Sequence, residues 1–102
     1  MNRILQFTIF MFWSTLLYSQ SVVVDGVTFS ADGKTLIKYP EDKMDEEYIV
    51  PEGTEIIGEK AFYFNYDLRN LVLPLSLDRI EDNAFENSDL YSITWKNFPK
   101  DI

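Results

Sequence analysis

Hydrophobic residues fall into three zones along the chain, and each zone has its own pattern. The first is an almost continuous apolar stretch from Ile4 to Tyr18. In the second, residues 20–47, apolar residues alternate with polar ones before the chain becomes strongly acidic. In the third, residues 48–102, one apolar pattern returns at a nearly fixed spacing. The chain is therefore predicted to contain a targeting segment, a β-hairpin with an acidic loop, and an array of repeats.

The first zone is typical of a signal peptide. It begins with a short positive segment, Met1-Asn2-Arg3, and its apolar stretch is fifteen residues long. A permanent membrane-spanning helix needs about 20 apolar residues, so this stretch is short for an anchor. We expect residues 1–19 to be removed by cleavage near Ser19, which gives a secreted or cell-surface protein. An uncleaved N-terminal anchor is the alternative.

The second zone, residues 20–47, predicts a β-hairpin cap followed by an acidic loop. Its first half places β-forming residues on both sides of an Asp25-Gly26 break, namely Val22, Val24, Val27 and Phe29. Residues 30–34 contain a second Asp-Gly pair, which favours a tight turn. A returning strand then ends at Pro40 and contributes Leu36, Ile37 and Tyr39. Residues 41–47 carry five carboxylates, so we expect them to form a solvated loop.

The third zone, residues 48–102, repeats with a nearly constant period that shortens once, by a single position. The pairs at a spacing of 23 are Pro51 with Pro74, Ile57 with Ile80, and Ala61-Phe62 with Ala84-Phe85. One residue is lost after the Ala-Phe pair, so the later pairs, Leu68 with Leu90 and Leu71 with Ile93, have a spacing of 22. The zone therefore holds about two and a half copies of the repeat.

A period of this length with Leu-x-x-Leu-x-Leu spacing is the signature of a leucine-rich repeat. Here the motif reads Leu68-x-x-Leu71-x-Leu73 and then Leu90-x-x-Ile93-x-Trp95. Alternation along each strand turns Leu71, Leu73, Ile93 and Trp95 inward, where they stack between rungs, and Ile80 also returns to the core. Phe62 and Phe85 are predicted to be equivalent core positions on the convex side. We expect a short leucine-rich repeat solenoid, mostly β, with a loop or 3₁₀ convex side and an N-terminal β-hairpin cap.

The repeat also resembles a known family. Residues 50–62, Val-Pro-Glu-Gly-Thr-Glu-Ile-Ile-Gly-Glu-Lys-Ala-Phe, are similar to the Pro-x-x-Val-x-x-Ile-Gly-x-x-Ala-Phe repeat of BspA-like leucine-rich repeat proteins, and residues 73–85 are a second copy. Residues 32–40 resemble the hairpin that opens such arrays. Thr54 replaces the usual Val, and Glu81 replaces the usual Gly. The resemblance implies a bacterial surface or secreted protein with a role in adhesion and in the binding of host proteins.

Composition excludes several classes of function. The chain has 17 acidic and 9 basic residues, a net charge of −8, and neither Cys nor His. An acidic surface repels phosphate, so we expect no nucleic-acid partner. Disulfides, thiol catalysis, ordinary zinc sites and His-based acid–base catalysis are excluded. The sequence has no glycine-rich phosphate loop and no calcium-loop pattern, so we expect no cofactor, no metal and no enzymatic activity.

The candidate binding residues lie on the outward side of the predicted repeat strands. Glu47, Asn70 and Ser92 form one column, and Ile49, Val72 and Thr94 form the next. Neighbouring rungs lie about 4.8 Å apart, so the two columns form a small flat ladder. Solenoids commonly bind protein or peptide on such a surface. Alternatively, these residues only supply β-propensity, and the sequence does not separate the two interpretations.

Three hypotheses for function follow. The first is an exported, non-catalytic protein-binding or adhesion module whose partner is an extracellular protein or peptide, such as a host or surface protein. The second is a structural or capping unit that associates with other repeat chains, since the strand Tyr91 to Trp95 is predicted to be an unpaired edge that pairs with a second copy or a partner repeat. The third, more remote, is a carbohydrate-binding or carbohydrate-acting protein, suggested by aromatic residues beside the Ala-Phe positions, among them Tyr63, Phe64 and Tyr66.

Overall fold

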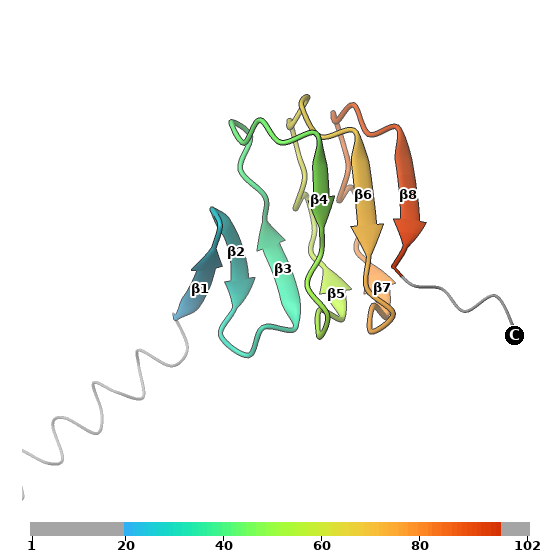
Figure 1. Ribbon diagram of the computed structural model, residues 1–102. Coiled ribbons are helices and arrows are strands. Elements are labelled where there is room, and N and C mark those ends of the chain that lie inside the picture. Colours follow the sequence, from blue (N-terminus) through green and yellow to red (C-terminus); the bar gives the residue numbers. More distant parts are fainter. Residues whose placement is uncertain (1–19, 97–102) are drawn as a thin grey trace, which may run out of the picture.

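A computed structural model describes residues 20–96, which form eight β-strands in two sheets (Figure 1). The larger sheet has the strand order β1-β2-β3-β5-β7, and the smaller sheet has the order β4-β6-β8. The strands are β1 (Ser21–Val24), β2 (Val27–Ser30), β3 (Thr35–Lys38), β4 (Glu47–Ile49), β5 (Ile56–Ile57), β6 (Asn70–Leu73), β7 (Arg79–Ile80) and β8 (Ser92–Trp95). Over these residues, no helix is long and apolar enough to cross a membrane.

Two tight turns fold the three N-terminal strands against one another. Asp25 and Gly26 both have a positive φ, 54° and 83°, as the central residues of a type I′ hairpin turn require. At the second turn the Asp32 carboxylate accepts hydrogen bonds from the Ser30 hydroxyl (2.7 Å) and the Lys34 amide (3.0 Å). Both turns lie where the sequence predicts them. β3 then pairs in parallel with β5, so the hairpin strands continue the larger sheet.

The repeats stack on one another through two parallel ladders. In the smaller sheet Tyr48 aligns with Leu71 and Leu71 with Ile93, as the longer and the shorter predicted spacing require. In the larger sheet Ile57 aligns with Ile80. This second ladder is not predicted by the sequence, which indicates only a loop or a 3₁₀ helix on that side. Instead, each copy has a two-residue strand followed by turns, and two residues carry too little alternation to reveal a strand.

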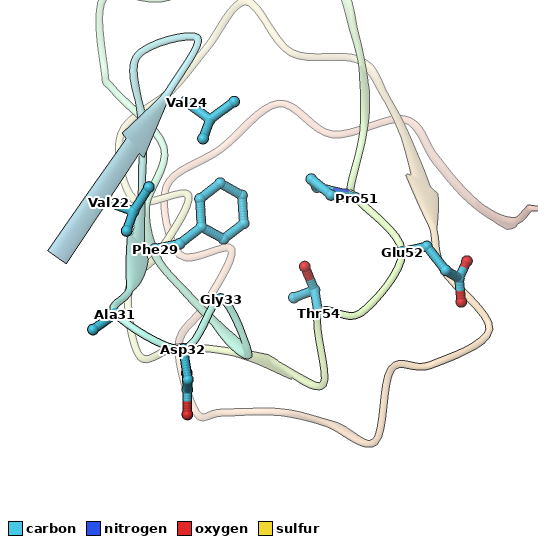
Figure 2. Close-up of a pocket in the computed structure, with 9 residues that line it drawn as sticks. All are labelled: Val22, Val24, Phe29, Ala31, Asp32, Gly33, Pro51, Glu52 and Thr54. Carbon is cyan, nitrogen blue, oxygen red and sulfur yellow. The ribbon is translucent and has the colours of Figure 1, made fainter.

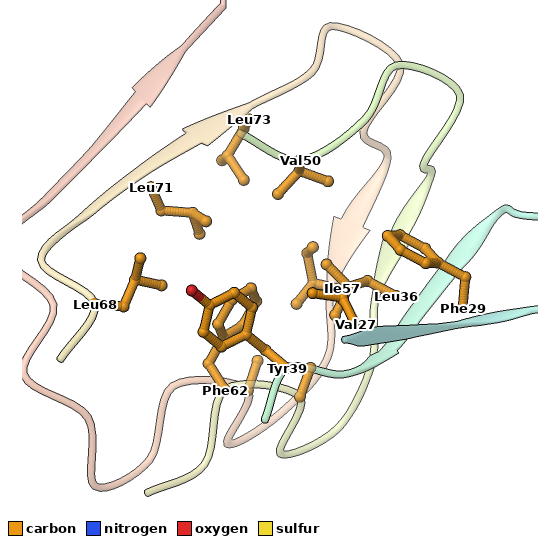
Figure 3. Packing of buried hydrophobic residues seen from close by; sticks show 12 residues of the cluster. Val27, Phe29, Leu36, Tyr39, Val50, Ile57, Phe62, Leu68, Leu71 and Leu73 are labelled. Atoms are coloured by element: carbon orange, nitrogen blue, oxygen red, sulfur yellow. The ribbon is translucent and has the colours of Figure 1, made fainter. Parts of the chain in front are cut away.

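Side chains from both sheets meet in one core (Figure 3). An aromatic column runs through it: the ring of Phe62 lies 4.9 Å from that of Tyr39 and 5.2 Å from that of Phe85, centroid to centroid. Phe85 occupies the position in its copy that Phe62 occupies in the preceding one, as predicted. Phe62 is fully buried, however, whereas Phe85 is only partly buried. The buried apolar residues are Val27, Phe29, Leu36, Tyr39, Val50, Ile57, Ala61, Phe62, Leu68, Leu71, Leu73 and Ala84.

The last described rung is less buried than the sequence predicts. Ile80, Ile93 and Trp95 are predicted to point into the core, yet they are 42%, 44% and 46% exposed. Their counterparts one rung earlier, such as Ile57 and Leu71, are fully buried because a following strand covers them. No strand of the described chain covers β7 or β8 in this way. In a stacked repeat the burial of a residue therefore depends on its neighbouring rung as much as on its own identity.

The predicted acidic loop, residues 41–47, ends one residue earlier in the structure, because Glu47 begins β4, and several contacts attach the loop to the fold. The Lys43 ammonium lies 3.1 Å from the Asp25 carboxylate in the first hairpin turn. The Asn65 side-chain amide donates hydrogen bonds to the carbonyls of Pro40 (2.7 Å) and Lys43 (3.1 Å). The carboxylates of the loop remain largely exposed, but its backbone carbonyls are hydrogen-bonded by the following repeat, so the loop is held against the fold.

The Tyr39→Phe variant is expected to be as stable as the parent or more stable by up to about 1 kcal/mol. Tyr39 is fully buried, and its hydroxyl has no hydrogen-bond partner in the described structure. Burial raises the pKa of this hydroxyl well above its ordinary value, so the group stays neutral. Removing an unpaired buried polar group relieves a desolvation cost. Urea denaturation measures the effect, and a loss of more than about 1 kcal/mol would mean that the hydroxyl has a partner in solution.

Candidate protein-binding surface

The smaller sheet places the six predicted binding residues on one outward surface, which we call the strand face. Its residues are Glu47, Ile49, Asn70, Val72, Ser92 and Thr94. The parallel register aligns Glu47 with Asn70 and Asn70 with Ser92, and it aligns Ile49 with Val72 and Val72 with Thr94. The inward residues of β6, Leu71 and Leu73, are buried and hold this strand against the core. The strand face is therefore a ladder of two columns and three rungs on a rigid support.

The first column is polar and fully accessible. Glu47, Asn70 and Ser92 are all exposed. The Ser92 hydroxyl donates a hydrogen bond of 2.7 Å to the Asn70 side-chain oxygen, which joins β8 to β6 across the face. Asn70 also carries an amide donor on the exposed side chain, and Glu47 contributes a carboxylate at the first rung. This column can therefore hydrogen-bond the backbone or the polar side chains of a partner.

The second column is mainly apolar. Ile49 is 50% exposed, Val72 is half-buried and Thr94 is exposed. These β-branched residues lie beside the polar column and lose water-accessible apolar surface when a partner covers them. None of the six residues is positioned as a nucleophile beside a general base. The chemistry of the strand face is thus suited to binding.

The structure adds two residues that sequence reasoning missed. Arg69 and Tyr91 directly precede β6 and β8, and the Arg69 guanidinium carbon lies 5.2 Å from the Tyr91 ring centroid. Tyr91 is 80% exposed. Tyrosine and arginine are the residue types most enriched at the energetic centres of protein interfaces. The sequence offers one indication of this pair. Arg69 and Tyr91 occupy matched positions of the repeat, and each directly precedes a strand.

A groove lies at the opposite end of the molecule, between the hairpin and the turn that follows β4 (Figure 2). We call it the N-terminal groove. Its volume is about 400 Å³, and the ring of Phe29 lies at its centre. The lining residues are Val22, Val24, Phe29, Ala31, Asp32, Gly33, Pro51, Glu52 and Thr54. The sequence does not predict this groove, because its two walls come from segments that are far apart along the chain.

Three aromatic side chains follow the first Ala-Phe pair on the turn of residues 63–66. The Tyr63 and Phe64 rings are 4.2 Å apart, and the Phe64 and Tyr66 rings are 6.2 Å apart, with tilts of 35° and 36°. The Lys60 ammonium lies 5.2 Å from the Tyr63 ring centroid. Because the rings are tilted against each other, they do not form one flat surface on which a row of sugar rings could stack. The arrangement gives the carbohydrate hypothesis little support.

Left-handed backbone recurs at matched positions of the two copies. Phe64 has φ of 63° and its counterpart Asn87 has 57°, while Lys60 has 56° and its counterpart Asn83 has 60°. Asparagine tolerates this conformation, whereas a bulky side chain such as that of Phe64 is strained by it. The second copy therefore has the residue type that the turn favours at both positions, and the first copy has it at neither.

The Phe64→Asn variant is expected to be more stable than Phe64→Ala by about 0.5–1 kcal/mol, because asparagine is less penalised at positive φ. Both variants lose the ring, so the comparison isolates the backbone. Denaturant unfolding of the two variants side by side gives the difference. Equal stabilities would show that the backbone at residue 64 relaxes when the ring is removed.

Strands stacked at the period of the sequence repeat, with their leucine positions buried between rungs, define a leucine-rich repeat protein. Within this class, residues 43–102 match the family model of the BspA type leucine rich repeat region, which describes six copies of the repeat. The match covers more than half of the chain, and the chain belongs to this family. No curated protein and no solved structure matches the chain.

Proposed function

We propose that this protein is an exported, non-catalytic repeat module that binds an extracellular protein or peptide through the strand face. The observation that carries the proposal is the parallel register of β4, β6 and β8. It brings residues from three copies of the repeat into two adjacent columns, one polar and one mainly apolar. Membership of a repeat family supports an interaction role, since stacked repeats typically recognise partners along their strands. We also infer that the stacked rungs form a short solenoid.

Charge favours a basic partner for this surface. The protein carries a net charge of −8, Glu47 is the first residue of β4, and Glu46 directly precedes it. A basic region on the partner would be attracted over about 8–10 Å at physiological ionic strength, which increases the rate of association. The same charge opposes nucleic acid as a partner, for the electrostatic reason given above.

Export forms the second part of the proposal. The leader, residues 1–19, lies outside the described residues, and the proposal rests on its sequence and on the family, whose members are mostly surface or secreted proteins. β1 begins at Ser21, so cleavage near Ser19 leaves every described strand intact. The intact mass of the protein recovered outside the producing cell tests export. A mass that still includes Met1 would favour a membrane anchor.

Binding by the strand face is tested with purified extracellular and cell-surface proteins as candidate partners. Affinities are measured by surface plasmon resonance for the parent and for Asn70→Lys and Val72→Lys. Both substitutions lie on the central strand β6, and the centre of an interface usually contributes most of its binding energy. Each substitution is therefore expected to lower the affinity for a true partner at least tenfold. Ile37→Lys is the matched control: Ile37 is a partly exposed aliphatic residue of the other sheet, and its substitution should change the affinity less than threefold. A partner that binds both strand-face variants as tightly as the parent would exclude this surface.

A second candidate function is association with other repeat chains through β8. It is favoured by the half-exposed core positions Ile93 and Trp95, and by the edge position of β8 in the smaller sheet. Sedimentation across micromolar concentrations compares the parent with Ile93→Lys and Thr94→Pro. Association in the parent that both variants abolish would support this function. A parent that remains monomeric throughout would remove it.

A further inference from the structure

The strand β1 is an exposed edge of the larger sheet. Within residues 20–96 it pairs only with β2, so one side of its backbone has free N–H and C=O groups. Val22, Val23 and Val24 are 43%, 63% and 53% exposed. Natural edge strands usually carry a charge, a proline or a bulge that prevents pairing with another chain. The sequence Ser-Val-Val-Val of β1 has none of these protections and consists largely of strong β-formers.

The inner side of this edge opens into the N-terminal groove. The register of the hairpin places Val22 opposite Phe29 and Val24 opposite Val27, so these four side chains share one face of the sheet. Val27 and Phe29 are buried, whereas Val22 and Val24 are about half-exposed because the groove lies in front of them. Figure 2 shows Val22 and Val24 on one wall and Pro51 on the other. A strand added outside β1 would direct alternate side chains to the mouth of this groove.

The rim of the groove is acidic. Asp32 lies at the hairpin turn, and Glu52 lies at the turn after β4; the groove lining includes no lysine or arginine. Hydrogen bonds from the Lys34 amide and the Ser30 hydroxyl lower the pKa of the Asp32 carboxyl, so the group is charged at neutral pH. The Glu52 carboxylate is held in place by a hydrogen bond of 3.1 Å from the Ser76 amide. Both carboxylates lie on the outer side of the rim and point away from the cavity (Figure 2), where a cation outside the groove can reach them.

We propose that β1 and the N-terminal groove bind an extended peptide segment of another protein, which adds as a sixth strand to the larger sheet. The segment has apolar side chains at alternate positions, which enter the groove beside Val22 and Val24, and a lysine or arginine that pairs with Asp32 or Glu52. Main-chain hydrogen bonds to the edge supply affinity, and the groove and its carboxylates supply selectivity. A second copy of this acidic chain is a poorer occupant, because it brings its own carboxylates to the same rim. This site is separate from the strand face.

The test uses a fluorescein-labelled probe in which alternating valine and threonine residues are flanked by lysine. Binding to the purified protein is followed by fluorescence anisotropy. Two further probes carry N-methyl groups on the alternate amides of one edge or of the other. A peptide that adds to β1 uses one edge only, so one methylated probe is expected to lose at least tenfold in affinity and the other less than threefold.

Matched variants of the protein locate the site. Val24→Lys places a cation at the groove and is expected to lower the affinity for the probe at least tenfold. Val23→Lys, one residue away on the opposite face of β1, should change affinity less than threefold. Asp32→Asn and Glu52→Gln together should lower the affinity for the probe by about three- to tenfold. Val72→Lys, on the strand face, should leave this affinity unchanged. Thermal unfolding of each variant establishes that it remains folded.

Several outcomes would overturn the inference. They are the absence of binding up to millimolar probe, equal binding of both methylated probes, and equal losses for Val23→Lys and Val24→Lys. Dimerisation of the parent that Val24→Lys abolishes would assign the edge to a second copy instead. None of these outcomes bears on the strand face, which is tested by its own variants.

Discussion

Replacing Asn65 by alanine is expected to lower the free energy of unfolding by about 3–5 kcal/mol. Asn65 is completely buried. Its side-chain oxygen accepts hydrogen bonds from the amides of Leu68 (2.8 Å) and Asp67 (3.0 Å). Its amide donates to the carbonyls of Pro40 (2.7 Å) and Lys43 (3.1 Å). Alanine would leave these backbone groups unpaired away from water, at a cost of roughly 1–3 kcal/mol for each fully buried group.

Two comparisons sharpen this prediction. Asn65→Asp keeps the acceptor for Leu68 but removes both donors and buries a charge, so it should also be strongly destabilising at neutral pH. Asn87→Ala, at an exposed asparagine of the second copy, should cost only about 1 kcal/mol through its left-handed backbone. Urea denaturation curves give all three values. If Asn65→Ala stayed within about 1 kcal/mol of the parent, water would have to replace the lost hydrogen bonds.

Replacing Phe62 by alanine is expected to cost about 3–5 kcal/mol, whereas Phe85→Ala should cost roughly half as much. Phe62 is 1% exposed and is stacked between Tyr39 and Phe85, so its removal leaves a cavity bounded on both sides. Phe85 contacts a neighbouring ring on one side and is partly exposed, so the surroundings can close more of the space. A domain of this size has only about 5 kcal/mol or somewhat more of net stability, so Phe62→Ala should be only marginally stable.

Guanidinium or urea unfolding followed by tyrosine and tryptophan fluorescence measures both variants. Phe64→Ala serves as the control, since Phe64 is exposed on the same turn and its loss should cost the least of the three. Equal costs for Phe62→Ala and Phe85→Ala would show that the second copy is as well covered in solution as the first.

The sequence predicts the strands whose inward residues form a leucine pattern. The Leu-x-Leu and Ile-x-Trp segments identify β6 and β8, and the period then places a first strand at residues 48–50, one residue later than the observed β4. The outward columns follow directly, because alternation along a strand and a constant spacing determine which residues align. The residues of the strand face could be named in advance for this reason, although their role in binding is a separate question.

The features that escape prediction depend on contacts between distant segments. Asn65 is structural because carbonyls at residues 40 and 43 happen to face it, which a local pattern does not reveal. The apolar character of Ile93 predicts a buried side chain. Ile93 is exposed because no strand of the described chain covers β8. The N-terminal groove likewise exists only where the hairpin and the turn after β4 come together. The contact between Arg69 and Tyr91 can be predicted only when the alignment of the first residues of β6 and β8 is known.

The single change in repeat spacing has a consequence for how such arrays vary. The longer spacing relates Phe64 to Asn87, whereas the shorter one relates Asp67 to Asp89, so the lost residue falls in the turn between these positions. The strands β6 and β8 on the following segment remain in register. The difference of one residue between the two copies is thus absorbed in this turn before the chain returns to the ladder. Copies of unequal length can therefore stack with their outward columns still aligned, so the residues of these columns can differ from copy to copy while the core pattern stays the same.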